Sequence, residues 1–187
     1  DYAELSIAML DLYEASFAHR WLAAADRLVR KMLVDFWDEA DGAFCYTSAA
    51  HDHVLVRSKP VYDGPVPSGN ATAALALLRL AKFLDDRDYS AKAETLLKNM
   101  SGRLRDQPRA YPYMLCALDF HLGPVQEIAI VGLPDRDDTN ELIRAVRQGL
   151  LPNKVLTLRL PDEDSRQIEP MIPWAAGKSM LSEKAKI

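Results

Sequence analysis

The chain has 187 residues, 49% of them hydrophobic, which is enough to bury the core of one domain or of one domain with a small appendage. Its net charge of −4, without a long cluster of lysine or arginine, argues against nucleic acid as a partner. Arg79 and Lys82 interrupt the longest apolar run, Ala71 to Leu84, so neither a membrane span nor a membrane partner is expected.

The first elements are predicted to be a pair of helices followed by a long loop. Helical periodicity runs from about Tyr2 to Phe17, and a second, amphipathic stripe runs from Leu22 to Phe36. The few residues between them predict an antiparallel hairpin. From Trp37 to Pro67 the helical period is lost, and apolar runs at Ala43 to Thr47 and Val54 to Arg57 predict a small β-hairpin within the loop.

A rigid polar turn, Tyr62 to Asn70, leads into the most apolar helix of the chain. Pro65 and Pro67 fix φ and disfavour helical backbone in the residues before them, while Ser68 is a good N-cap. The helix is therefore predicted to begin sharply at Gly69 or Asn70 and to end at Leu84. Since it is apolar almost all round, it must be covered by other elements on most sides.

Two more helices are predicted, Tyr89 to Leu104 and Tyr111 to Leu122, again after a short link and then a longer one. The first, third and fifth helices are the more apolar, whereas the second and fourth are amphipathic. Stacked hairpins with this alternation are typical of an α/α toroid or an α-solenoid. The long loops join the outer to the inner helices, so one face carries the starts of the first, third and fifth helices, where binding residues are expected.

After Pro124 the pattern changes to a βαβ unit. Strand-like runs at Glu127 to Gly132 and Lys154 to Arg159 flank a helix over Asn140 to Arg147, and no period survives from Pro161 on. The predicted fold class is mainly α, a partial α/α toroid of antiparallel hairpins with a small βαβ appendage. The expected divisions are helical hairpins at 1–123, a βαβ segment at 124–160 and an irregular tail at 161–187.

The cysteines and histidines give little sign of a metal centre. Cys45 and Cys116 lie far apart without the spacing of a zinc site or a disulfide framework, so we expect free thiols in a reducing, cytoplasmic setting. His51-Asp52-His53 lacks a third ligand, and Gly132-Leu133-Pro134-Asp135 is not a glycine-rich phosphate loop. Neither a metal nor a cofactor is expected. Because the chain opens at Asp1 in mid-pattern, we expect it to be a piece of a longer protein.

Several short motifs occur in a specific order along the chain: Asp1-Tyr2-Ala3, Trp37-Asp38, Asp63-Gly64, Pro67-Ser68-Gly69-Asn70, Tyr111-Pro112, Glu127 to Gly132, and Leu151-Pro152-Asn153. In this order they resemble the C-terminal half of the bacterial YyaL and spermatogenesis-associated protein 20 family, over most of the chain to about Leu160. The resemblance implies a thioredoxin-fold N-terminal domain followed by a six-hairpin α/α toroid similar to N-acylglucosamine 2-epimerases and glycosidases. This chain would be the last part of that toroid, so the absent N-terminal portion is an expected partner.

Asp63 is the candidate catalytic residue, at the turn before the apolar helix. A carboxylate in a partly desolvated funnel has a tunable pKa and can act as general acid or base, or bind sugar hydroxyls. The alternative is an ordinary Asp-Gly turn residue. Ser68 and Asn70 are candidate substrate-binding groups, although helix capping alone explains Ser68. The amide of Asn70 suits a polyol.

Other candidates for substrate binding lie near the same predicted rim. Lys59, and less clearly Arg57, could hold an anionic group or could be exposed surface charges. Tyr2 and Tyr111 offer rings and hydroxyls to a sugar or serve as rim packing. Asp1 could supply a second carboxylate, but paired-carboxylate chemistry needs a separation that sequence does not supply.

These residues lead to three functional hypotheses. The first is a fragment of a carbohydrate-active or sugar-binding toroid, epimerase- or glycosidase-like in the full-length protein and inactive as a fragment, with a sugar or glycan as ligand. The second is a non-catalytic helical scaffold attached to a thioredoxin-like redox domain. The third is a plain α-solenoid interaction module. A concave pocket with converging carboxylates and aromatic residues favours the first, a flat or plugged mouth the second, and an open superhelical groove the third.

Overall fold

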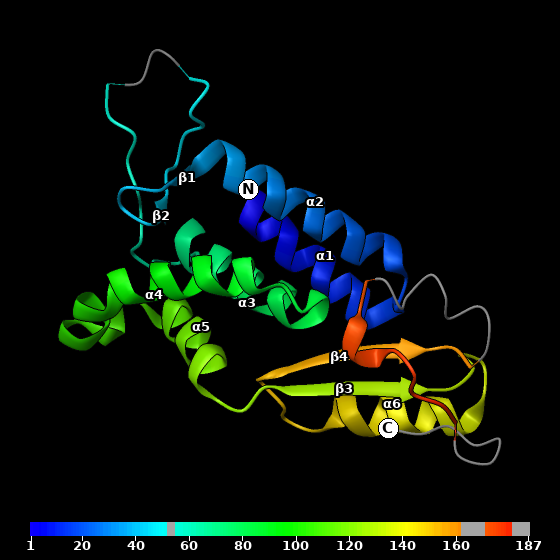
Figure 1. The fold of residues 1–187 in the computed structure, drawn as a ribbon. Helices are drawn as coiled ribbons and strands as arrows, with labels where there is room; N and C mark the ends of the chain where they lie inside the picture. Colours follow the sequence, from blue (N-terminus) through cyan, green and yellow to red (C-terminus); the bar gives the residue numbers. More distant parts are fainter. Residues whose placement is uncertain (52–54, 162–170, 181–187) are drawn as a thin grey trace.

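The computed structural model of the protein describes residues 1–51, 55–161 and 171–180, and it is mainly helical (Figure 1). The predicted fold class, mainly α with a small βαβ appendage, is confirmed. The elements within the described ranges are α1 (Tyr2–Ser16), α2 (His19–Phe36), β1 (Trp37–Asp38), β2 (Ala43–Phe44), α3 (Gly69–Leu84), α4 (Arg87–Asp106), the 3₁₀ turn η1 (Pro108–Ala110), α5 (Pro112–Leu122), β3 (Gln126–Val131), α6 (Asp137–Gln148), β4 (Lys154–Arg159) and the 3₁₀ turn η3 (Pro173–Ala175).

Helix α3 is the centre of the helical part and packs against α1, α4 and α5 (Figure 1). Ten of its side chains are buried, on nearly every side of the helix, as its apolar composition predicts. The Tyr13 ring of α1 meets Phe83 of α3 edge to face, with 5.3 Å between ring centroids. The first two helices are more one-sided: α2 buries a single stripe of Leu22, Ala25, Val29 and Met32.

The start and the end of α3 lie where the capping residues and the link in the sequence predict them. The Ser68 hydroxyl accepts a hydrogen bond from the backbone N–H of Ala71, so it caps α3, which begins at Gly69. Asp85 ends α3 in the left-handed conformation, and Asp86 then caps α4 through the N–H groups of Asp88 and Tyr89. These local caps explain why the link between α3 and α4 is so short.

The β-hairpin after α2 pairs differently from the prediction. Trp37–Asp38 pairs antiparallel with Ala43–Phe44, whereas residues 55–57 of the expected second strand are not in a strand and Val54 lies outside the described residues. The turn between the two short strands closes through Gly42, whose φ of +57° suits glycine. One bond of the expected pairing region does occur, from the Tyr46 N–H to the Ser58 carbonyl at 2.8 Å.

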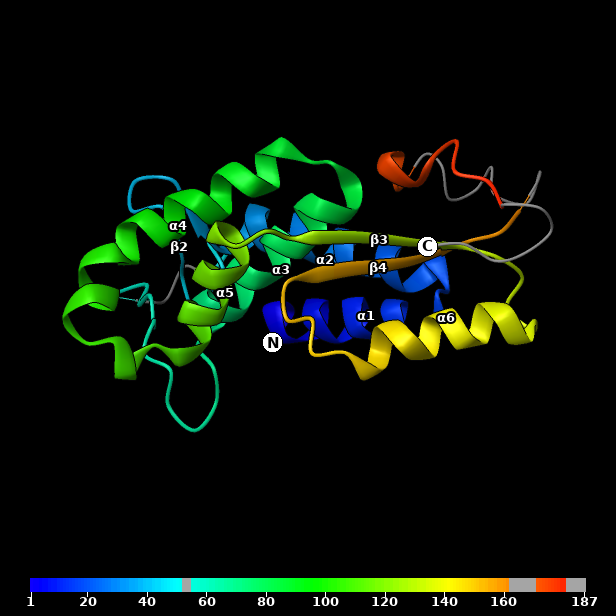
Figure 2. The ribbon, with the colours of Figure 1, turned by 90° about the horizontal axis from the view of Figure 1, so that it is seen from below.

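Strands β3 and β4 form a parallel pair in which Gln126 is opposite Lys154 and Val131 is opposite Arg159. One face, with Ala129 and Val155, belongs to the core of the helical part, while Ile130, Leu156 and Leu158 pack with Ile143 and Val146 of α6. Figures 1 and 2 show α6 running along the sheet. The alternation of faces along each strand therefore places the sheet between α6 and the helical part.

Side chains of α1 join the sheet to the helices. The hydroxyls of Tyr13 and Thr157 share a buried hydrogen bond of 2.6 Å. Next to it, Glu14 lies 3.2 Å from the Lys154 ammonium and 3.5 Å from the Arg79 guanidinium. Burial raises the pKa of Tyr13 above its ordinary range, so this hydroxyl remains neutral and can serve as a hydrogen-bond partner at all ordinary pH values.

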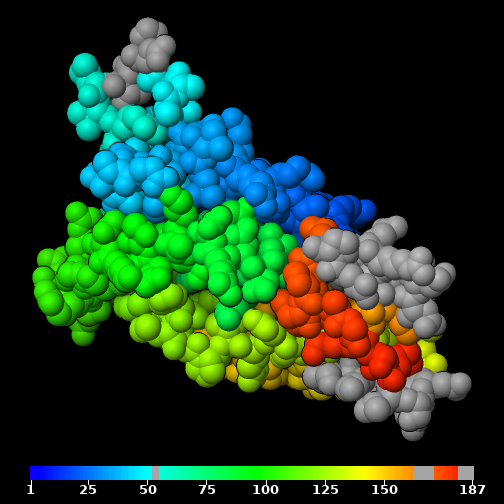
Figure 3. Space-filling model, viewed as in Figure 1, coloured from blue at the N-terminus to red at the C-terminus, as the bar shows by residue number. Residues whose placement is uncertain are grey.

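Beyond the sheet, the described part of the tail docks against α3. Ile172 is fully buried, and the Trp174 indole N–H donates to the Lys82 carbonyl at 2.8 Å. In the space-filling view this segment, coloured orange and red, lies against the body, while the cyan loop between β2 and α3 stands away from it (Figure 3). Among the described residues, none of the helices combines the length and apolar character needed to cross a bilayer.

Candidate functional site

The Asp63 carboxylate is buried and accepts hydrogen bonds from three backbone N–H groups. One oxygen accepts from Ser68 at 2.8 Å, and the other accepts from Tyr113 at 2.9 Å and Met114 at 3.0 Å. Its own N–H donates to the Ala110 carbonyl at 3.0 Å. The carboxylate therefore bridges the starts of α3 and α5, where unpaired N–H groups and the positive end of the helix dipole favour an anion.

Asn70 is equally committed to the backbone around it. Its amide oxygen accepts from the Phe44 N–H at 2.8 Å, and its amide nitrogen donates to the carbonyls of Phe44 and Pro60, both at 2.9 Å. The side chain thus fastens β2 and the approach to the turn onto the first turn of α3. Neither its acceptor nor its donors are left idle in this arrangement.

The basic side chains before the turn also have partners within the chain. The Lys59 ammonium lies 2.7 Å from the Asp38 carboxylate and 2.5 Å from that of Asp41, and these hydrogen bonds raise its pKa above the ordinary range. The Arg57 guanidinium donates to the carbonyls of Thr47 and Asp35. Both therefore stabilise the loop and the β1–β2 turn, and the anion-binding role of Lys59 stays a prediction.

A cavity of about 530 Å³ lies beside this turn. It is formed by the first turn of α1, the end of α2, β2 and the residues that lead into α3. Its lining residues are Asp1, Tyr2, Ala3, Glu4, Met32, Phe36, Phe44, Cys45, Tyr46, Pro60, Tyr62, Val66, Pro67, Ser68, Gly69 and Asn70. Asp1, Tyr2, Ser68 and Asn70 of the predicted site meet here, whereas Asp63, Lys59 and Tyr111 do not line the cavity.

Two acidic residues at the start of α1, Asp1 and Glu4, line the cavity, and Glu4 is not among the predicted site residues. Glu4 follows Asp1 by three residues, so the two lie on the same face of the helix start. The Thr72 hydroxyl, fully buried on α3, donates to Glu4 at 2.7 Å. The spacing Asp1-x-x-Glu4 was a signal in the sequence, but only the position of α3 shows that it faces a cavity.

Aromatic rings form much of the wall. The rings of Tyr2 and Phe36 lie 5.4 Å apart and tilted by 50°. Tyr46 and Tyr62 belong to the lining and are largely exposed, so they stand at its rim. These two tyrosines, together with the buried thiol of Cys45, were also missed, because nothing in the local pattern shows that the long loop folds back onto α1.

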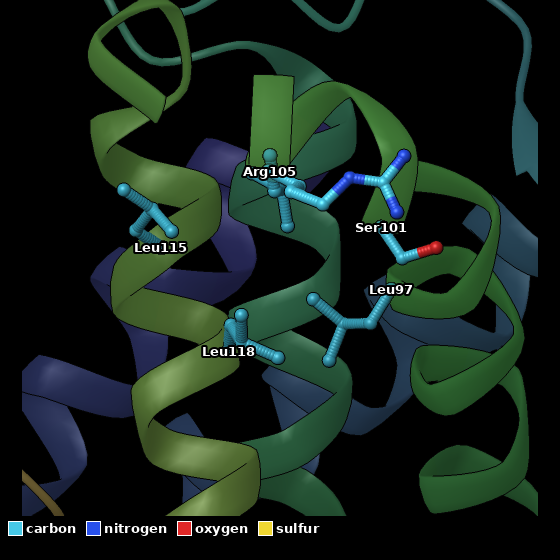
Figure 4. A pocket seen from close by; sticks show the side chains of 6 residues that line it. Leu97, Ser101, Arg105, Leu115 and Leu118 are labelled. Atoms are coloured by element: carbon cyan, nitrogen blue, oxygen red, sulfur yellow. The ribbon is translucent and has the colours of Figure 1, made fainter. Parts of the chain in front are cut away.

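A second cavity, of about 270 Å³, lies between α4 and α5 (Figure 4). Leucines from both helices make most of its wall, with Ser101 and Arg105 as its polar residues. Arg105 already pairs with the neighbouring Asp106 at 3.1 Å. Binding sites need a few converging polar groups to orient a ligand, so the larger cavity beside α1 is the better candidate.

No metal site emerges within the described residues, where no cluster of three or more histidine, cysteine, aspartate or glutamate side chains has suitable geometry. Asp52 and His53 of the His-x-His motif lie outside the described residues.

Similarity to known proteins covers the whole chain. No protein-family model matches it. It is 34% identical over 188 residues to spermatogenesis-associated protein 20 of Mus musculus and 37% identical over 186 residues to that of Homo sapiens, covering 24% of each. An uncharacterised protein of Caenorhabditis elegans is 32% identical over 165 residues, of which the chain covers 22%.

The predicted family resemblance is confirmed. The similarity extends over the entire chain, including the βαβ unit and the tail. The motifs alone indicate a resemblance only as far as about Leu160. The chain spans about a quarter of the length of these relatives.

Proposed function

We propose that the cavity beside α1 is a binding site for a small polyhydroxylated ligand such as a sugar. The observation that carries the proposal is the meeting of the Asp1 and Glu4 carboxylates with tyrosine rings in one concave space. Its volume of about 530 Å³ lies within the ordinary range for small-molecule sites, roughly 300–1,000 Å³.

The lining offers the two kinds of contact that a sugar ring needs. Carboxylate oxygens accept hydrogen bonds from hydroxyl groups, and these bonds are stronger than neutral ones. Tyrosine faces cover the apolar C–H surface of a ring, while their hydroxyls reach its polar edge. Tyr2 supplies such a face from α1, and Tyr62 supplies one from the loop before α3.

In this proposal Asp63 acts through position. Its three backbone hydrogen bonds hold the start of α3, and with it Ser68 and Asn70, in place beside the cavity. The acid or base role predicted for Asp63 stays a prediction, since a ligand would have to reach an oxygen that already accepts one or two N–H groups.

A second candidate function is a non-catalytic helical scaffold attached to a thioredoxin-like domain of the kind that the family resemblance implies. It is favoured by one specific observation: the polar groups of Asp63, Asn70 and Lys59 are all engaged by neighbouring parts of the chain. A scaffold needs such rigid joints but no ligand. The two functions therefore differ in whether any small molecule stabilises the protein.

A thermal-shift and calorimetric screen of the full-length gene product against monosaccharides, sugar phosphates and oligosaccharides tests the proposal. A sugar is expected to raise Tm, and Tyr62→Ala is expected to weaken its binding by about 1 kcal/mol, or roughly fivefold, because one ring face is lost. Tyr62 is 66% exposed, so its truncation should leave the fold intact.

Leu150→Ala serves as the control, since Leu150 is 93% exposed and lies outside the cavity lining. It should bind the sugar as the wild type does. If no sugar raises Tm, or if Tyr62→Ala binds as tightly as Leu150→Ala, the cavity is not the site and the scaffold function gains support.

A further inference from the structure

The cavity beside α1 has a one-sided charge. Its described lining contains the carboxylates of Asp1 and Glu4 and no lysine, arginine or histidine. Water-filled concave sites concentrate the field of the charges that line them, so a lining whose charged side chains are all carboxylates attracts cations and repels anions.

The cations around the cavity are neutralised by other side chains. Lys59, the residue before Pro60 in the lining, lies between the carboxylates of Asp38 and Asp41. Lys31, the residue before Met32 in the lining, pairs with Asp35 at 2.7 Å. Each lysine therefore brings at least one negative charge with it, and neither makes the cavity basic.

Glu4 is held in a way that leaves part of its carboxylate for a ligand. One oxygen accepts the Thr72 hydroxyl at 2.7 Å, and the other has no hydrogen-bond partner within the described parts of the chain. Because Thr72 is fully buried on α3, this bond holds one oxygen of the otherwise exposed Glu4 side chain against α3. A fixed carboxylate with a free oxygen is a good partner for an ammonium group.

The buried Ser68 side chain supplies a further polar contact. Its hydroxyl oxygen accepts from the Ala71 N–H at 3.2 Å, but its own proton has no acceptor among the described residues. Ser68 lines the cavity and is 6% exposed, so water has little access to this donor from elsewhere. A ligand oxygen that binds in the cavity would accept this hydroxyl proton and add a second hydrogen bond to Ser68.

The aromatic wall favours the same ligand charge. The faces of tyrosine and phenylalanine rings carry negative potential and attract ammonium groups. Tyr2 and Phe36 lie together on one side of the cavity, and Tyr62 stands at the rim. The carboxylates and the ring faces therefore both favour a positively charged ligand.

We propose that this cavity selects ligands that combine hydroxyl groups with a protonated amine, the class of the amino sugars, over phosphorylated or acidic sugars. The inference rests on the proposed function, because it assigns a substrate class to the same site. The amine binds the free oxygen of Glu4 with Asp1 beside it, a ring oxygen or hydroxyl accepts from Ser68, and the tyrosine faces cover the ring.

Isothermal titration of the full-length gene product with glucose, glucosamine and glucose 6-phosphate tests this selection, at a pH below the pKa of the sugar amine. Glucosamine is expected to bind at least about tenfold more tightly than glucose, and glucose 6-phosphate more weakly than either. Glu4→Gln keeps an oxygen for Thr72 but removes the charge, so it should weaken glucosamine about tenfold and change glucose by less than about twofold.

Glu141→Gln is the matched control, the same substitution on the exposed face of α6, and it should change none of the three affinities. If glucose and glucosamine bind equally, or if the phosphate binds most tightly, the selection is wrong while the sugar-binding function stands. If none of the three binds, both proposals fail. If Glu4→Gln and Glu141→Gln lose the same affinity, Glu4 does not contact the amine.

Discussion

Three backbone N–H groups converge on the carboxylate of Asp63, and they come from the starts of two helices that begin 43 residues apart in the sequence, at Gly69 and Pro112. An anion at one helix start is common, whereas one that serves two helices ties their ends to each other. Asp63 therefore acts at the residue scale as a joint between α3 and α5, and the position of everything at the cavity edge depends on it.

Replacing this carboxylate by an amide should weaken the joint. In Asp63→Asn at least one N–H group faces an NH₂ group or is left unpaired in a buried setting, which costs roughly 2–4 kcal/mol of unfolding free energy. Urea unfolding followed by circular dichroism measures this loss. Asp135→Asn, an exposed aspartate with no hydrogen bond to the described residues, is the control and should change stability by less than about 0.5 kcal/mol.

A stability of Asp63→Asn equal to that of the control would contradict the capping role and would leave the carboxylate available for the acid or base chemistry predicted from the sequence. A loss of ligand binding in this variant has to be compared at equal folded fraction, because loosening the starts of α3 and α5 also displaces Ser68.

The sequence predicts the role of a single polar residue where its hydrogen-bond partner is only a few residues away. Ser68 was recognised as a cap because its partner, Ala71, is three residues away. Asn70 and Lys59 were not assigned their structural partners, because Phe44 is 26 residues from Asn70 and Asp41 is 18 residues from Lys59. Hydrogen bonds of this kind depend on how the loop returns to the helix, which no local pattern encodes.

At the scale of elements, the β1–β2 turn is held against α4. Asn99 of α4 donates to the carbonyls of Asp41 and Gly42, and Lys92 pairs with Glu39 at 2.5 Å. The prediction of strands at Ala43 to Thr47 and Val54 to Arg57 was wrong in its pairing, because a tight turn at Gly42 lets Trp37–Asp38 reach Ala43–Phe44 first. Apolar alternation alone does not show which neighbour a short strand selects.

Two glycines should respond to alanine with opposite signs. At Gly42, with φ of +57°, a Cβ atom would lie 2.6 Å from both Asn99 and Thr95, so Gly42→Ala should lower the unfolding free energy by about 2–4 kcal/mol. At Gly102, inside α4, a Cβ atom meets nothing within 4 Å, so Gly102→Ala should raise it by about 0.5–1 kcal/mol. Thermal melts of both variants measure the difference.

The Gly102 variant also serves as the control for any general effect of alanine near α4. Equal stability of the two variants would mean that the turn can move away from α4 without cost, and the hydrogen bonds from Asn99 would then contribute nothing.

For the whole molecule, the helical pattern and the βαβ unit were predictable because each repeats a period along the chain. The cavity was predictable only in part. The sequence pattern places the starts of the inner helices on one face, and this brings Asp1, Tyr2, Ser68 and Asn70 together. It does not predict that Glu4, Tyr46 and Tyr62 also line the cavity. Those three depend on packing between α1, α3 and the loop before α3. Asn70, which donates to the Pro60 carbonyl, and the Tyr46–Ser58 bond hold the lining part of the loop beside the cavity, and these contacts join residues that are not neighbours in the sequence.

A prediction about the whole molecule concerns its proposed divisions at 1–123 and 124–160. One buried core joins them, since Ala129 and Val155 pack within the helical cluster, and the Tyr13–Thr157 hydrogen bond of 2.6 Å crosses between α1 and β4. We expect the helices and the βαβ unit to unfold in one cooperative transition.

A double-mutant cycle on the crossing hydrogen bond tests this directly. Tyr13→Phe and Thr157→Val should each lower the unfolding free energy by roughly 1–3 kcal/mol, because each removes one hydroxyl and leaves the other buried without its partner. The double variant should lose about 1 kcal/mol less than the sum of the two single losses. Urea unfolding followed both by far-ultraviolet circular dichroism and by amide hydrogen exchange in β3 and β4 reports on the two parts separately. Coincident midpoints in all four proteins show one folding unit, whereas an earlier transition confined to β3, α6 and β4, with additive losses in the cycle, shows that the βαβ unit is energetically independent of the helices.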